Sequence, residues 1–133
     1  MNIGRAAAAS GVTAKLIRYY EEIGLVRPAG RTPANYRDFD ERSIHELRFI
    51  RVARSLGFSV PEIAELLSLW RDPSRDAEAV RTMADARVQQ LEERAAGMTQ
   101  MAEALRALAA SCAQGERPQH PVLGPSPPRP PAT

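Results

Sequence analysis

Small and apolar residues recur at alternating steps of four and three between positions 84 and 112, and this spacing constrains the fold more than any other feature. The members of the repeat are Ala84, Val88, Leu91, Ala95, Met98, Ala102, Leu105, Ala109 and Cys112. A period of 3.5 residues held over several heptads is typical of a coiled coil. The repeat therefore predicts one helix over residues 76–112, roughly 50 Å long at 1.5 Å per residue.

A single helix of this length cannot bury its apolar stripe against a small domain. We therefore expect residues 76–112 to pair with the same helix of a second chain and form a homodimer. The alternation of alanine with larger Val, Leu and Met residues favours closely packed antiparallel helices.

The charge is distributed unevenly along the chain. Residues 1–57 carry ten Arg and Lys against six Asp and Glu, a balance of +4, whereas residues 58–133 carry eight against ten, a balance of −2. A basic first half predicts an anionic partner. No apolar run approaches the roughly 18 residues that span a bilayer, and the start lacks a signal-peptide pattern, so we expect no membrane association. A single cysteine forms no internal disulfide, which favours a reducing cytoplasm.

The first residues have the outline of a helix-turn-helix. Asn2 is placed to cap a short helix over residues 3–9, and Ser10-Gly11-Val12 interrupts it. Thr13 is placed to cap a second helix over residues 14–23. The alternative is an ordinary helical hairpin with no role in DNA binding.

The second of these helices predicts two different faces. The buried face is expected to contain Leu16, Tyr20 and Ile23, which follow the spacing i, i+4 and i+7. The opposite face is expected to present Lys15, Arg18 and Tyr19. A helix buried on one side and basic on the other suits the DNA major groove, where arginine reads guanine edges and other side chains reach phosphates.

The segment "VRPAGRTPANYRDFD", residues 26–40, combines turn-forming residues with arginines. Val26 and residues 36–39 are expected to pair as short strands, which would make a hairpin. Its arginines, Arg27, Arg31 and Arg37, suit a wing that lies on the phosphate backbone. The alternative is a surface loop with solvated arginines.

Two more helices are expected to complete the first domain. Asp40 caps a helix over residues 41–56, with Ile44, Leu47, Ile50, Val52 and Leu56 apolar at helical spacing. The segment "SVPE" carries a capping box and begins a helix that runs from residue 59 to residue 70. Its inward side chains are expected to be Ile63, Leu66, Leu67 and Trp70.

These segments resemble the DNA-binding head of MerR-type transcription regulators. The resemblance extends from residue 1 to about residue 120, and its most specific parts are "IRYYEEIGL", "NYRDFD" and "LGFSVPEIAELL". It implies a mainly α fold, in which a winged helix-turn-helix domain over residues 1–71 precedes a long antiparallel coiled-coil dimerisation helix over residues 76–112. The DNA-binding residues implied by match to the family's motifs are Thr13, Lys15, Arg18, Tyr19, Arg31, Tyr36 and Arg37.

The resemblance also implies a mechanism. Such dimers bind a palindromic operator in double-stranded promoter DNA, and effector binding makes them distort the duplex so that RNA polymerase can use the promoter. The energy of that deformation is supplied by contacts to the DNA backbone.

The segment "SCAQGERPQHPVL", residues 111–123, resembles the metal loop of the family's copper-efflux (CueR-type) branch. Those relatives hold a soft monovalent ion between two cysteines, whereas this chain has Cys112 at the first position and His120 at the second. Cu(I) accepts both thiolate and imidazole and tolerates two ligands almost in line. The resemblance thus implies a Cu(I) loop over residues 112–121, with Ag(I) and Zn(II) ranked behind Cu(I).

Several alternatives stay open. Cys112 continues the heptad pattern and suits a core position, and His120 suits a solvated loop. A regulator with one thiol could instead sense oxidants, electrophiles or a divalent metal, although the extra cysteine of mercury- and zinc-type relatives is absent from residues 77–79. An architectural protein that binds DNA without sequence preference is a remoter alternative. The sequence contains no phosphate-binding loop and no nucleophile beside a base. Nothing in it therefore indicates an enzyme. The proline-rich residues 122–133 are expected to be disordered.

Overall fold

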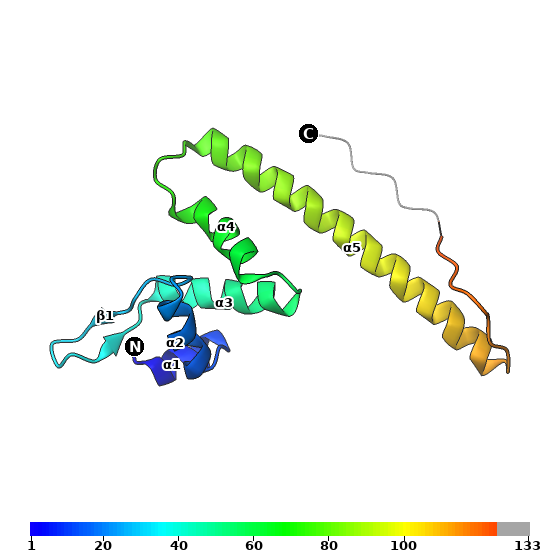
Figure 1. Ribbon diagram of the computed structural model, residues 1–133, viewed down its shortest axis with the longest axis horizontal. Coiled ribbons are helices and arrows are strands. Elements are labelled where there is room, and N and C mark those ends of the chain that lie inside the picture. The colour runs from blue at the N-terminus through cyan, green and yellow to red at the C-terminus, as the bar shows by residue number, and fades with distance from the viewer. Residues whose placement is uncertain (125–133) are drawn as a thin grey trace. The chain divides into compact units, whose positions relative to one another are not determined.

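The computed structural model describes residues 1–124 of the chain (Figure 1). Most of the proline-rich tail predicted to be disordered, residues 125–133, lies outside the described residues. The chain divides into two units, Met1–Ser74 and Arg75–Thr133, and each is described by itself below.

The first unit contains four helices and a two-stranded hairpin. Its elements are α1 (Ile3–Ser10), α2 (Ala14–Glu22), β1 (Gly30–Arg31), β2 (Arg37–Asp38), α3 (Glu41–Ser55) and α4 (Val60–Arg71). Helix α1 packs against α2 and α3, and α4 packs against α3. The winged helix-turn-helix predicted from the sequence is thereby confirmed.

Every helix of this unit begins at the predicted capping residue. The side chains of Asn2, Thr13, Asp40 and Ser59 each accept a hydrogen bond from a backbone N–H three residues later. Such caps satisfy amide groups that have no partner within the helix. At α3 the hydrogen bond from the Ser43 amide, strengthened by the Ser43 side chain, lowers the pKa of the Asp40 carboxyl below its usual value.

A single apolar core lies between these helices. The largest side chains completely enclosed in it are Ile17, Leu47, Ile50 and Ile63, which come from α2, α3 and α4. Tyr20, Val26 and Phe39 complete it from the end of α2 and from both ends of the wing segment. Burial of large aliphatic side chains, at about 2 kcal/mol each, stabilises the arrangement.

The predicted buried face of α2 is confirmed for Tyr20 but wrong for Leu16 and for Ile23, which lies at the C-cap. Leu16 and Ile23 are exposed, whereas Ile17 and Tyr20 are buried. The error has a simple cause, because neighbouring positions on a helix differ by about 100° and a helix of nine residues offers too few apolar side chains to fix the phase. Val52 on α3 and Leu56 at its C-cap are likewise exposed.

The strands of the wing are shorter than predicted and begin later. β1 pairs with β2 in antiparallel register, with Gly30 opposite Asp38 and Arg31 opposite Arg37. Val26, which was expected to lie in a strand, is instead a buried core residue. Val26 packs into the core because its side chain is hydrophobic. The strands therefore form only from residues beyond it, Gly30–Arg31 and Arg37–Asp38.

Trp70 also departs from the prediction. Its side chain is 70% exposed, although one ring edge packs against Phe49 with centroids 5.3 Å apart. Trp70 lies one residue before the end of α4, where the first unit supplies only Phe49 as an aromatic neighbour.

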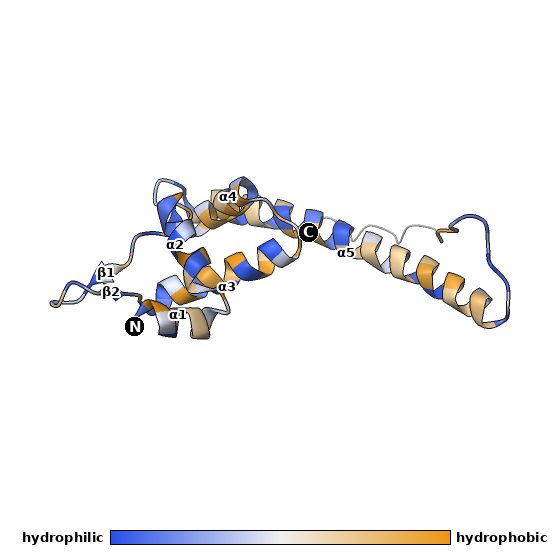
Figure 2. Cartoon of the chain, turned by 60° about the horizontal axis from the view of Figure 1, so that its bottom comes forward, coloured by the Kyte–Doolittle hydropathy of each residue, from blue (hydrophilic) through white to orange (hydrophobic). Residues whose placement is uncertain are grey.

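The second unit consists of α5 (Ala77–Ala113), which is 37 residues long and begins at the capping residue Asp76. At 1.5 Å per residue it extends about 55 Å. None of its residues is buried within the chain, and hydrophobic residues recur along its second half (Figure 2). Among the residues that the structure describes, no helix is long and apolar enough to cross a membrane.

Candidate nucleic-acid interface and metal loop

The exposed face of α2 presents three residues that were predicted from the sequence to contact DNA. Lys15, Arg18 and Tyr19 all reach solvent, because the opposite face is held in the core by Ile17 and Tyr20. Cation-bearing side chains on the outer face of the second helix of a helix-turn-helix can enter a major groove.

The first turn of α2 is fixed by Thr13. Its hydroxyl accepts the Leu16 N–H at 3.2 Å, so the side chain is engaged in capping before any ligand arrives. The remaining exposed amides of the first turn can donate to a phosphate.

The tip of the wing, between β1 and β2, is a tight turn around Pro33. The Asn35 amide donates to the Thr32 carbonyl at 2.8 Å, and Asn35 adopts left-handed backbone with φ of 65°. Two further hydrogen bonds join Thr32 and Tyr36, one in each direction. The turn leaves the Tyr36 side chain 72% exposed. The geometry thus offers an aromatic hydroxyl at the wing, beside the strand that carries Arg31.

Arg37 is placed differently from the other proposed DNA residues. Its side chain is partly buried, and its Nε lies 3.5 Å from Oε1 of Glu21, at the end of α2. The second carboxylate oxygen of Glu21 accepts the Ala29 N–H at 3.2 Å. Sequence reasoning missed Glu21, because nothing in the local pattern distinguishes it from the exposed Glu22 beside it.

Arginines of α3 support the turn between α1 and α2, and these too were missed. Arg48 Nε donates to the Ala9 carbonyl at 2.9 Å and so satisfies the end of α1. The Arg51 side chain passes directly over Gly11, which has left-handed backbone with φ of 77°. The turn that positions α2 therefore depends on a helix about 40 residues later in the sequence.

Arg71, at the end of α4, joins three parts of the first unit. It donates to the Leu25 carbonyl at 2.9 Å and makes a two-pronged ion pair with Glu46, in which Nε and Oε1 are 3.2 Å apart. Both side chains are mostly buried. The pair therefore links α4 to α3 and to the segment that leads from α2 into the wing.

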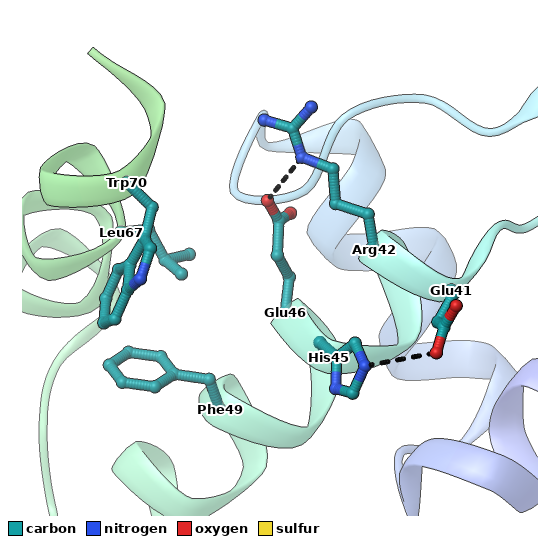
Figure 3. Close-up of a pocket in the computed structure, with 7 residues that line it drawn as sticks. All are labelled: Glu41, Arg42, His45, Glu46, Phe49, Leu67 and Trp70. Atoms are coloured by element: carbon teal, nitrogen blue, oxygen red, sulfur yellow. Dashed lines mark ion pairs between the residues drawn. The ribbon is translucent and has the colours of Figure 1, made fainter. Parts of the chain in front are cut away.

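A cavity of about 680 Å³ opens between α3 and α4 (Figure 3). Phe49, Leu67 and Trp70 form its apolar side. The polar side consists of two ion pairs on α3, Arg42 with Glu46 and His45 with Glu41. Within residues 1–124, the side chains proposed for DNA or metal do not line this cavity.

Cys112 and His120 lie at the end of the second unit. Cys112 belongs to the last turn of α5, and its thiol is exposed. Its backbone carbonyl accepts the Gly115 N–H at 3.0 Å, and Gly115 has left-handed backbone, so the chain turns immediately after the cysteine. His120 follows in the coil, also exposed, with Nδ1 3.3 Å from the Pro121 carbonyl.

The donor set suits an ion that needs few ligands. In the described part of the chain, no three His, Cys, Asp or Glu side chains come together as a metal site. A tetrahedral Zn(II) site normally needs three or four such ligands, whereas Cu(I) accepts two. One thiol and one imidazole form a donor pair that Cu(I) can accept. The assignments of the DNA-contacting and metal-binding residues stay predictions.

Comparison with known proteins identifies two family models. "MerR HTH family regulatory protein" matches residues 1–70, and "MerR, DNA binding" matches residues 44–108. "Heavy metal-dependent transcription regulator 2" of Rhizobium meliloti is 47% identical over 92% of this chain and 84% of its own. "HTH-type transcriptional regulator CueR" of Salmonella typhimurium is 36% identical over 92% of this chain and 89% of its own. The crystal structure of a MerR-family regulator from Listeria monocytogenes superposes with a TM-score of 0.68 at 31% identity, and covers 86% of this chain and 85% of that one.

Proposed function

Because the chain belongs to the MerR family of helix-turn-helix regulatory proteins, we propose that it is a metal-responsive transcription activator whose effector is Cu(I). The chain is a DNA-binding transcription regulator and not an enzyme. The proposal goes further by naming the metal, its ligands and the residues that meet the DNA.

The proposed DNA interface consists of α2 and the wing. Arg18 addresses base edges in the major groove, and Lys15 and Tyr19 reach the phosphates beside it. Thr13 contributes at the first turn of α2, and the wing residues Arg31, Tyr36 and Arg37 hold the backbone on the flank. The exposure of α2's basic face supports this arrangement.

The proposed assembly is a homodimer that joins two such interfaces. Large apolar side chains on α5, among them Val88, Met98 and Leu105, are at least half exposed within one chain. Pairing of α5 with its copy in antiparallel orientation would cover them. The dimer then presents two copies of α2 to a palindromic operator in a promoter that RNA polymerase shares, and it activates by distorting the intervening DNA.

The observation that carries the metal proposal is the exposed Cys112 thiol at the end of α5, followed eight residues later by the exposed His120. The names of the relatives, one heavy metal-dependent and one CueR, support a metal effector. We assign the thiolate of Cys112 and one ring nitrogen of His120 as the two ligands. This pair is electrically neutral around Cu(I), because the thiolate charge cancels that of the ion.

The test is an anaerobic titration of the full-length protein with Cu(I) against a competing chelator. Tight binding is expected in the wild-type protein and is expected to be lost in both Cys112→Ser and His120→Ala. His45→Ala is the matched control, because His45 is also exposed but lies on α3 and pairs with Glu41. It should bind as the wild type does.

Each other outcome has a defined meaning. Loss of binding in Cys112→Ser alone would remove His120 from the site. Absence of tight Cu(I) binding in the wild type would overturn the copper assignment, and titration with Zn(II) and exposure to oxidants would then be compared. None of these results bears on the assignment as a DNA-binding regulator.

A further inference from the structure

We propose that Glu21 is a positioning residue that sets the wing relative to the recognition helix α2. It does so by holding the Ala29 backbone and the Arg37 side chain at the base of the wing. This inference rests on the proposed function in one respect, namely that α2 and the wing bind the same DNA.

The wing has little to hold it in place by itself. β1 and β2 consist of two residue pairs, and an isolated two-stranded hairpin is at best marginally stable in water. One of those pairs places Arg31 directly opposite Arg37, and like charges at directly opposed positions destabilise a hairpin. The wing's position therefore requires contacts from outside the hairpin.

Glu21 supplies such contacts from the last turn of α2. Its carboxylate accepts the Ala29 N–H through Oε2 at 3.2 Å and faces Arg37 Nε through Oε1 at 3.5 Å. A single side chain thus reaches both the backbone that enters the wing and a side chain of the strand that leaves it. The negative charge also offsets the repulsion between Arg31 and Arg37.

Three features of its position disfavour the negative charge of Glu21. Its side chain is only 11% exposed, although a buried carboxylate loses its hydration. A negative charge near the C-terminal end of a helix opposes the helix dipole. It also lies on the helix proposed to meet a polyanion. Contacts with the wing are the one evident gain that offsets these costs.

Neighbouring Glu22 provides a matched control. It has the same charge on the same helix turn but is exposed. If only the overall charge mattered, neutralising either carboxylate would strengthen binding to DNA. The positioning role predicts opposite signs for the two residues, because loss of the Glu21 charge releases Arg37 and the wing.

The experiment compares full-length wild type, Glu21→Gln and Glu22→Gln on a duplex carrying the operator that footprinting with the wild type defines. Glu21→Gln is expected to weaken binding roughly tenfold, the size of a lost charge-assisted contact. Hydroxyl-radical protection should decrease mainly at the phosphates flanking the major-groove site. Glu22→Gln should bind as well as the wild type or more tightly. Equal affinities for the two variants would overturn the proposal.

Arg37→Gln shows whether Glu21 acts through Arg37. This variant alone should weaken binding, and adding Glu21→Gln should reduce affinity much less than it does in the wild type. If the double variant loses affinity by the product of the two single losses, Glu21 and Arg37 act independently, and the coupling between them is contradicted. A thermal unfolding curve for each variant, in which Glu21→Gln keeps a cooperative transition, separates positioning from loss of the fold.

A DNA-free measurement keeps this inference separate from the proposed function. In nitrogen-15 spectra of the wild type, the Ala29 amide and the Arg37 Nε–H should exchange slowly with solvent. In Glu21→Gln, exchange at Arg37 should accelerate, whereas in Glu22→Gln it should not. Rapid exchange of both groups in the wild type would overturn the inference even if DNA binds. Failure of the wild type to protect any operator would instead contradict the proposed function.

Discussion

Gly11 lies in the turn that orients α2, and its surroundings restrict which residue can occupy this position. Its backbone is left-handed, and a Cβ there would lie 2.9 Å from Cδ and 3.0 Å from Nε of Arg51. Gly24 has a similar backbone, with φ of 80°, but an added Cβ would meet nothing within 4 Å. The two glycines therefore separate backbone strain from steric conflict.

We predict that Gly11→Ala lowers the free energy of unfolding more than Gly24→Ala does. Left-handed backbone alone costs an alanine about 1 kcal/mol, and displacement of the Arg51 side chain adds about 1 kcal/mol at position 11. Urea denaturation of the two variants measures the difference. Equal losses would mean that Arg51 moves aside without cost.

At the scale of the elements, the sequence identified each helix, and it identified the capping residues of the four helices in the first unit, because these features depend on side chains close together in the chain. The phase of short helices was harder to predict. Leu16 and Ile23 were expected to be buried and are exposed, since nine residues contain too little periodic information to fix the buried arc. Trp70 was expected in the core and is exposed, because its burial depends on which elements lie nearby.

The candidate site likewise contains one part that the sequence predicts and one part that it does not. The exposed positions of Lys15 and Arg18 followed from the pattern of one helix. The contacts of Glu21 with Ala29 and Arg37 span eight and sixteen residues and join α2 to the segment before β1 and to β2. No local periodicity encodes such contacts, so this part of the site became visible only in the folded chain.

Arg71 offers a test of the link between α4 and the rest of the first unit. We predict that Arg71→Lys lowers the free energy of unfolding by about 2 kcal/mol, because a lysine cannot reproduce a two-pronged pair with Glu46 while also donating to the Leu25 carbonyl. Chemical denaturation checks the value.

Arg42→Lys is the matched control for this prediction. Arg42 approaches the same carboxylate, with Nε 3.7 Å from Glu46 Oε1, but its side chain is more than half exposed. An exposed ion pair contributes at most about 1 kcal/mol. Similar losses for both variants would show that the geometry at Arg71 adds nothing special.

For the molecule as a whole, α5 is expected to determine the oligomeric state. We predict that Leu105→Asp, which places a charge on the apolar stripe, gives a monomer at concentrations where the wild type sediments as a dimer. Sedimentation velocity measures the mass. Ala107→Asp introduces the same charge on the same helix, two positions away and therefore on another face, and should remain dimeric.

Two outcomes would contradict the proposed pairing. A wild type that sediments as a monomer would remove the dimer altogether. A Leu105→Asp variant that stays dimeric while Ala107→Asp dissociates would place the contact on a different face of α5.

The absence of any buried residue on α5 within its own chain has a consequence for the cell. In the proposed dimer, α5 is covered only by a second copy and gains stability by mass action, so the melting temperature is expected to rise with protein concentration. Newly made chains at low copy number would be the most accessible to proteases, and those that find a partner would survive. Abundance would then set a threshold below which the regulator is removed before it reaches its promoter.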